Sequence, residues 1–210
     1  MPDTLTRFLD WTKRQLSFSH YIQLSSVIAD NIVCGKGGEL VASWKLRGLA
    51  FETADDIDVE TATDAVNTLY RALAQTEKLA VQVHRIRRPM VDELTASEEP
   101  GFARDLSLAY NRRIGHEHLM ATELYVTLIS NDRRKLTVDS LRDEIDNFEK
   151  ICGIFEKSFN AYEPERLGVY RKHDAEFSSQ LSFYNFLLTG VWQEVRIPDA
   201  PLCDVLGNIY

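Results

Sequence analysis

Residues 177–207 read FSSQLSFYNFLLTGVWQEVRIPDAPLCDVLG and carry the strongest structural signal in the chain. The stretch begins with serines and an apolar run, passes a glycine, and ends in a short extended segment punctuated by proline. An apolar run bounded in this way predicts a last helix over residues 177–188, followed by a short strand.

The earlier block DNIVCGKGGELVASWKLRGLAFET, residues 30–53, predicts a hairpin. Its two extended segments flank the sequence GKGG, where Gly37 and Gly38 permit the positive φ that a tight turn needs. In the second strand apolar residues alternate with more polar ones, so one face of that strand is the more apolar. Gly48 ends the strand, and we assign structural turn roles to all three glycines.

Three longer helices and two further strands follow from the hydrophobic pattern. Apolar residues recur every three or four positions over residues 59–76, 102–118 and 138–159, as on one face of a helix. Alternation over residues 79–88 predicts a half-buried strand, and residues 123–130 form the next one. The order of elements predicts an α+β fold. We expect a small antiparallel sheet of about four strands, helices packed mainly on one face, and a C-terminal helical and extended segment.

The helix predicted over residues 102–118 ends in the sequence His116-Glu117-His118. Zinc-binding histidines on a helix lie one turn apart, whereas these two are two residues apart and diverge. We therefore interpret them as a solvated helix end rather than a metal site. The residues expected to face inward on this helix are Phe102, Leu106, Ala109 or Tyr110, and Ile114.

The helix predicted over residues 138–159 carries apolar residues at steps of three and four along its length. Such a seam can form an intermolecular coiled coil, or the core stripe of a helix that packs on a sheet. Ile151 and Ile154 widen the apolar face beyond a two-position seam, which favours the core.

Taken in this order, the elements resemble the N-terminal domain of the type IV secretion and conjugative transfer ATPases, the CagE/TrbE/VirB component family. In that family a hairpin with a glycine turn opens the domain, and a Ser-x-Leu-x-Phe-like helix leading to a Pro-flanked strand closes it. The resemblance covers roughly residues 20–207. It implies a cytoplasmic docking domain that links an ATP-driven motor to inner-membrane subunits of a secretion or conjugation channel, and to other copies of the ATPase.

The family's ATP chemistry belongs to a later motor domain and requires a phosphate-cradling loop of the form G-x-x-x-x-G-K-[ST]. The sequence has no such loop, because its one Gly-Lys pair, Gly35-Lys36, is followed by another glycine. The resemblance therefore implies that residues 1–210 are a single non-catalytic domain without a cofactor. ATP and Mg²⁺ would belong to a motor domain beyond Tyr210, so we expect either a piece of a longer ATPase or a truncated relative.

Charge and hydropathy limit the partners. The net charge is −8, with −4 on residues 1–105 (12 basic and 16 acidic) and therefore −4 on the remainder. An acidic domain is poorly suited to neutralise phosphates, so we expect no direct binding of nucleic acid. The sequence has no apolar run of 18 residues and no signal sequence, so we expect an indirect membrane contact through partners at the inner membrane.

Two surfaces are candidates for partner contact. One is a possible peripheral helix within residues 1–19, and the other consists of basic strand ends. The candidate residues are Phe8, Leu9 and Trp11 on the first, and Arg87, Arg88, Arg133 and Arg134 on the second. The alternative for the arginines is that they only offset the acids of residues 89–100.

A second interpretation is a small stand-alone α+β enzyme that uses His84, His116 or His118 as a base or ligand. It predicts a concave pocket that joins one of these histidines to carboxylates. No nucleophile, base and acid with catalytic spacing stands out from the sequence, which favours the docking domain.

Overall fold

The computed structural model describes residues 18–49, 54–74, 79–89, 100–116, 120–130 and 138–207. Its main sheet has six antiparallel strands in the order β1-β2-β3-β5-β4, with β6 beside β3. The strands of this sheet are β1 (Leu24–Ala29), β2 (Ile32–Gly35), β3 (Leu40–Leu46), β4 (Leu79–Pro89), β5 (Met120–Ser130) and β6 (Pro164–Arg166).

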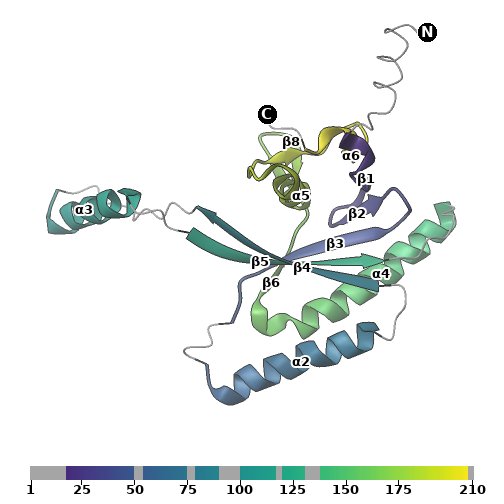
Figure 1. Cartoon of the computed structure of the whole chain (residues 1–210), viewed down its shortest axis with the longest axis horizontal. Coiled ribbons are helices and arrows are strands. Elements are labelled where there is room, and N and C mark those ends of the chain that lie inside the picture. Colours follow the sequence, from purple (N-terminus) through teal and green to yellow (C-terminus); the bar gives the residue numbers. More distant parts are fainter. Residues whose placement is uncertain are drawn as a thin grey trace, which may run out of the picture.

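Helices lie on both sides of this sheet. The long helices α2 (Asp56–Ala74) and α4 (Val138–Ser158) share one face, and the shorter α5 (Ser179–Thr189) lies on the other (Figure 1). The helix α3 (Phe102–His116) stands beyond the ends of β4 and β5, away from both layers (Figure 1). The remaining elements are η1 (Phe18–His20), η2 (Asn160–Tyr162), α6 (Leu202–Val205) and a small sheet of β7 (Val169–Lys172), β8 (Ala175–Ser178) and β9 (Val195–Arg196).

The α+β class expected from the sequence is confirmed, although the strands are more numerous than four. Every helix and strand expected between residues 59 and 188 is present, with bounds within three residues of the expected ones. The short strand expected after the last helix is β9, whereas the sequence pattern missed β1, whose LSSVIA lacks strict alternation, and β6 to β8, which are three or four residues long. Such short strands cannot show a period.

The apolar face of β3 and β5 forms the main core with α2 and α4. The ring of Trp44 lies 4.5 Å from that of Phe155, and its Nε1 donates a 2.9 Å hydrogen bond to Glu156 Oε1. Phe155 in turn stacks on Phe159, with ring centroids 4.4 Å apart. The apolar seam of α4 is therefore a core stripe, as expected, whereas Ile154 is exposed and does not widen it.

The opposite face of β3 is more polar but is buried as well. Ser43 Oγ lies 2.8 Å from both Thr127 Oγ1 and the hydroxyl of Tyr184 on α5. Gln180 of α5 donates from Nε2 to the carbonyl of Val41 at 3.0 Å. These polar groups pair with one another, so they are buried at little cost. The alternation along β3 thus marks two different kinds of packing.

The helix α5 begins and ends at the residues that cap it. Ser178 accepts a hydrogen bond from the N–H of Leu181 (3.2 Å), and Gly190 ends the helix in the left-handed region, with φ 74°. The side chain of Asn185 accepts a 2.8 Å bond from the N–H of Gly207, which ties the last described residue back to α5.

The glycines in and after the hairpin differ in backbone conformation. Gly38 has φ 90° and Gly48 has φ 100°, a region that residues with a Cβ rarely adopt. Gly37 has no such φ; its N–H donates 2.9 Å to a carboxylate oxygen of Glu39.

Candidate docking surface

The ribbon of β4 and β5 extends past the rest of the sheet. β3 pairs with β5 as far as Leu46 opposite Leu124, whereas β4 and β5 stay paired as far as Pro89 opposite Met120. The last four residue pairs therefore project beyond β3, by about 13 Å at the usual rise per residue. We call the projecting ribbon and its helix the arm, which comprises residues 86–89, 102–116 and 120–123 (Figure 1).

A buried ion cluster holds the base of the arm. Glu123 accepts one hydrogen bond from Lys45 Nζ (2.6 Å) and two from Arg88 Nε and Nη2 (both 2.8 Å). The hydroxyl of Tyr125 donates a further bond at 3.0 Å, and 10% of the Glu123 side chain is exposed. The guanidinium of Arg88 also lies over the ring of Trp192, 5.0 Å from its centre. The cluster joins three strands and the C-terminal segment, so it ties the base of the β4–β5 ribbon to the body.

The electrostatics of this cluster suit a structural clamp. The hydrogen bonds from Arg88 are the main cause that lowers the pKa of Glu123 to about 2, and Lys45 lowers it further against the opposing effect of burial. Burial, followed by the charge of Glu123, raises the pKa of Tyr125 above its usual range. Near neutral pH the carboxylate is charged and the phenol protonated, so neither group is poised to exchange a proton.

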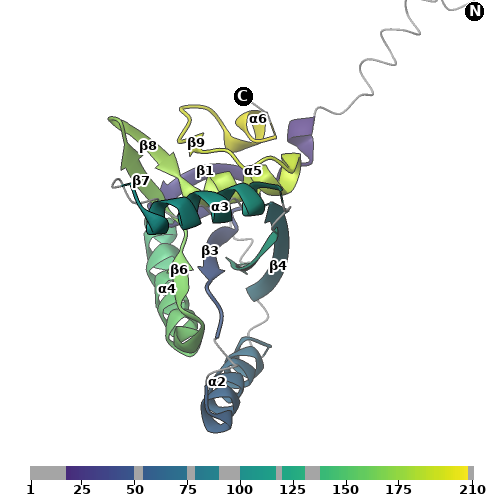
Figure 2. The same cartoon turned by 90° about the vertical axis from the view of Figure 1, so that its left-hand side faces the viewer.

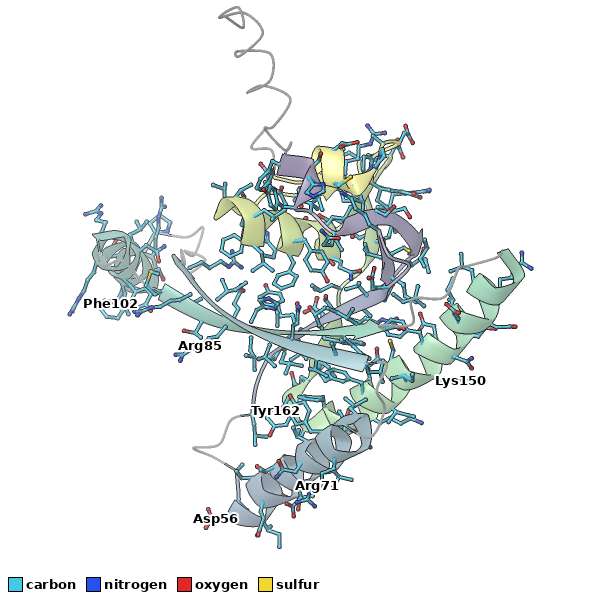
Figure 3. The ribbon with its side chains drawn as sticks, turned by 45° about the vertical axis from the view of Figure 1, so that its right-hand side comes forward. Asp56, Arg71, Arg85, Phe102, Lys150 and Tyr162 are labelled. Atoms are coloured by element: carbon cyan, nitrogen blue, oxygen red, sulfur yellow. The ribbon has the colours of Figure 1, made fainter. Side chains whose placement is uncertain are left out.

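The apolar side chains of α3 face solvent. The exposed fractions are 82% for Phe102, 57% for Leu106 and 40% for Tyr110, which follow one another at steps of four residues. We call these three residues the α3 ridge; Figure 3 labels Phe102 on the helix, well away from the sheet. The expectation that this stripe faces inward is wrong, because α3 lies at the tip of the arm, beyond the ends of β4 and β5 (Figure 1). Seen from that end of the molecule, α3 lies in front of the strands and of α5 (Figure 2).

Two of the predicted contact residues, Arg87 and Arg88, lie in the described part of the chain and differ in environment. Arg87 is exposed on the arm, whereas Arg88 points to Glu123. The acid that Arg88 pairs with among the described residues is therefore Glu123 in β5, and the acids of residues 89–100 lie outside the described residues. The remaining candidates lie outside the described residues, and these are Phe8, Leu9, Trp11, Arg133 and Arg134.

The alternative interpretation requires a pocket that joins a histidine to carboxylates, and the described part of the chain does not present one. The ring of His84 packs edge-on against Phe183, with centroids 5.5 Å apart, and burial lowers its pKa. Two surface hollows, one beside β8 and β9 and one beside η2, are lined without any histidine. The side chain of His116 and the whole of His118 lie outside the described residues.

Metal-binding groups and membrane-spanning helices are both absent from the described ranges. No three His, Cys, Asp or Glu side chains within them are grouped so as to hold a metal ion. None of the helices described there combines the length and the apolar character needed to cross a bilayer. The exposed apolar ridge on the arm is therefore the candidate binding surface of the described chain.

Two family models match the chain. The N-terminal domain of the type IV secretion system ATPase VirB4/TrbE matches residues 31–137, which include the hairpin, α2 and the arm. The CagE, TrbE, VirB family, component of type IV transporter system, matches residues 165–209, which include α5 and the C-terminal segment.

Similar curated proteins carry related names. The type IV secretion system protein virB4 of Brucella suis is 31% identical over 225 residues, which cover 97% of this chain and 27% of that protein. The PtlC homolog of Bordetella bronchiseptica is 28% identical, with coverages of 97% and 27%. The CagE protein of Helicobacter pylori is 24% identical, with coverages of 76% and 18%. The chain thus spans about a quarter or less of the length of these curated relatives.

The α+β domain with its projecting arm and the two matches together define a component of a secretion machine. The chain belongs to the VirB4/TrbE family of type IV secretion system ATPases and matches the N-terminal domain of that family. The resemblance inferred from the sequence is confirmed.

Proposed function

We propose that this chain is a non-catalytic docking module of a type IV secretion or conjugation ATPase. It links an ATP-driven motor to the inner-membrane subunits of the channel and to neighbouring copies of the ATPase, so that DNA or protein is transferred. The module itself needs no cofactor, since ATP and Mg²⁺ act in the motor domain. It is cytoplasmic and is held at the inner membrane through its partners.

The arm is the observation that supports this proposal. A braced ribbon positions α3 away from the body, and the α3 ridge faces solvent. A 15-residue helix is marginally stable on its own in water, and exposed apolar side chains in a row mark a binding surface. Components of type IV secretion systems work in a multi-subunit complex, which provides partners for such a surface.

Co-purification tests the docking role. The tagged chain is expressed together with the membrane subunits of its secretion apparatus and extracted in mild detergent. We expect those subunits to be retained, and a matched tagged domain without the family fold to retain none. Failure of both this chain and its full-length parent to retain any membrane subunit would contradict the proposal.

A second measurement tests the absence of catalysis. Calorimetry with ATP and Mg²⁺ should show no tight binding by residues 1–210, because the sequence has no phosphate-cradling loop. Micromolar, Mg²⁺-dependent binding would show that the chain is more than a docking module.

A further inference from the structure

The arm presents large apolar side chains on a positively charged helix. The α3 ridge consists of Phe102, Leu106 and Tyr110, all exposed. The helix α3 has three arginines and one aspartate, which gives a net charge of +2 with its histidine neutral. An occupant of this surface therefore needs an apolar contact and negative charge around it.

The outer face of α2 has the complementary character. The inner stripe of this helix, which includes Ala62 and Leu69, is buried in the core. Its outer side carries Ile57, which is 69% exposed, followed one and two turns later by the small exposed residues Thr61 and Ala65. The helix has four acids and one arginine, a net charge of −3, and the acids Asp56, Asp58, Glu60 and Asp64 are all exposed.

These two faces lie on separate parts of the molecule. In Figure 3 the labelled Phe102 of α3 and Asp56 of α2 mark different corners of the structure, and Figure 1 shows α3 at the tip of the arm and α2 at the outer side of the helical layer. The ion cluster around Glu123 holds the base of the ribbon, and α3 lies beyond its end, apart from the α2 of the same chain (Figure 1).

We infer that the α3 ridge of one copy docks on the outer face of α2 in a second copy of this chain. The inference rests on the proposed function, since it names the surface by which neighbouring copies meet. The contact is head-to-tail, because α3 and α2 are different surfaces. In an open row of copies, the copy at one end keeps a free α2 face and the copy at the other end keeps a free arm.

Charge favours a second copy over a lipid surface as the occupant. The net charge of the chain is −8, which outweighs the +2 of α3. A chain with this net charge is repelled by a surface of anionic headgroups, whereas the α2 face of a second copy presents its acids beside an apolar side chain. A contact between two helices is small, so the pairwise affinity is weak, and several copies held in one assembly strengthen it through effective concentration.

Sedimentation of the 210-residue chain at concentrations up to about 100 µM tests the contact, a range suited to a small interface. We expect the wild type to associate, and both Leu106→Asp on α3 and Ile57→Arg on α2 to weaken association at least tenfold. The matched controls are Leu108→Asp and Thr63→Arg, exposed positions on other sides of the same helices, which should associate as the wild type does. All four positions are exposed, so the melting temperatures should stay close together.

A mixture of the two interface variants distinguishes a head-to-tail contact from any symmetric one. The Leu106→Asp copy keeps an intact α2, and the Ile57→Arg copy keeps an intact arm, so the mixture should form a dimer that neither variant forms alone. If the mixture stays monomeric, or if Leu106→Asp associates as the wild type does, the inference is overturned.

Two further outcomes separate this inference from the proposed function. A wild-type chain that stays monomeric throughout but retains membrane subunits overturns the copy-to-copy contact and leaves the docking role in place. Flotation with vesicles of anionic phospholipid, lost in Leu106→Asp and kept in Leu108→Asp, would show that the ridge binds lipid instead, and would also overturn it.

Discussion

The body and the arm share two strands, β4 and β5, but they are built in opposite ways. In the body, β5 lies between β3 and β4, and its residues Val126 and Leu128 are buried beneath helices. Past Leu124 the same ribbon has no third strand; Ile86 and the ion cluster of Glu123 hold its base, and the helix at its end is exposed. Stability and binding therefore reside in different parts of the chain: changes in the body and at the base of the arm should destabilise the domain, and changes in α3 should alter what it binds.

The largest effect is expected in the core of the body. Phe155 is completely buried and stacks against both Trp44 and Phe159. Phe155→Ala should lower the free energy of unfolding by about 3–5 kcal/mol, through lost burial and the cavity left behind. A urea titration that is monitored by tryptophan fluorescence measures this loss of stability. The exposed Ile154→Ala on the same helix is the control and should change little; equal losses would mean that α4 is not packed as described.

The next effect is expected at the boundary between body and arm. Glu123→Gln removes the charge that Lys45 and Arg88 share, and should lower the free energy of unfolding at pH 7 by about 2 kcal/mol, given the partial exposure of both cations. Because the folded pKa of Glu123 is depressed to about 2, this stabilisation is complete above the ordinary glutamate pKa and is lost as the pH falls towards 2.

Urea titrations at several pH values check this dependence. The difference between wild type and Glu123→Gln should be constant above about pH 5 and should shrink below it. Glu176→Gln is the matched control, since Glu176 pairs with Arg171 at 3.2 Å in a well-exposed site and should contribute less than about 0.5 kcal/mol. A difference that grows on acidification would show that the carboxylate is not the charged member of the cluster.

A smaller effect is expected at the hairpin of the body. Gly38 has φ 90°, so Gly38→Val should cost about 1–3 kcal/mol in backbone strain. Gly101 precedes the arm helix, and a Cβ there would meet no atom within 4 Å. Gly101→Ala is therefore the matched change in the arm and should leave the melting temperature nearly unchanged. An unchanged melting temperature for Gly38→Val would show that the β2–β3 hairpin does not require a positive φ at residue 38.

Much of the body could be predicted from the sequence because its signals are local. The period of α4 and the serine and glycine that bound α5 depend on neighbouring residues, and the structure has both helices where these signals lie. The alternation of β3 was also informative, although its polar face is covered by α5 through the bonds of Ser43, which no local pattern shows.

The arm could not be predicted, because whether its apolar stripe is buried or exposed depends on which elements lie beside it in the fold. A stripe such as Phe102, Leu106 and Tyr110 has the same spacing whether it packs in a core or meets a partner. The available signal for the clamp was Glu123, an acid at the start of an otherwise apolar strand, since an acid there needs a cationic neighbour. Its neighbours Lys45 and Arg88 lie 78 and 35 residues away in the sequence, so their identity required the fold.

The smallest effect on stability is expected at the tip of the arm. It tests most directly whether the body and the arm differ in their contribution to stability. Phe102 and Phe155 are the same residue type at opposite extremes of burial, 82% and 0% exposed. Phe102→Ser should change the free energy of unfolding of the body by less than about 0.5 kcal/mol, because an exposed side chain buries nothing when the chain folds. Trp44 is buried in the body, so the same fluorescence titration used for Phe155→Ala follows its unfolding. A loss above about 1 kcal/mol would mean that α3 packs against the body in solution; the arm would then be part of the core, and the ridge would no longer be available to a second copy.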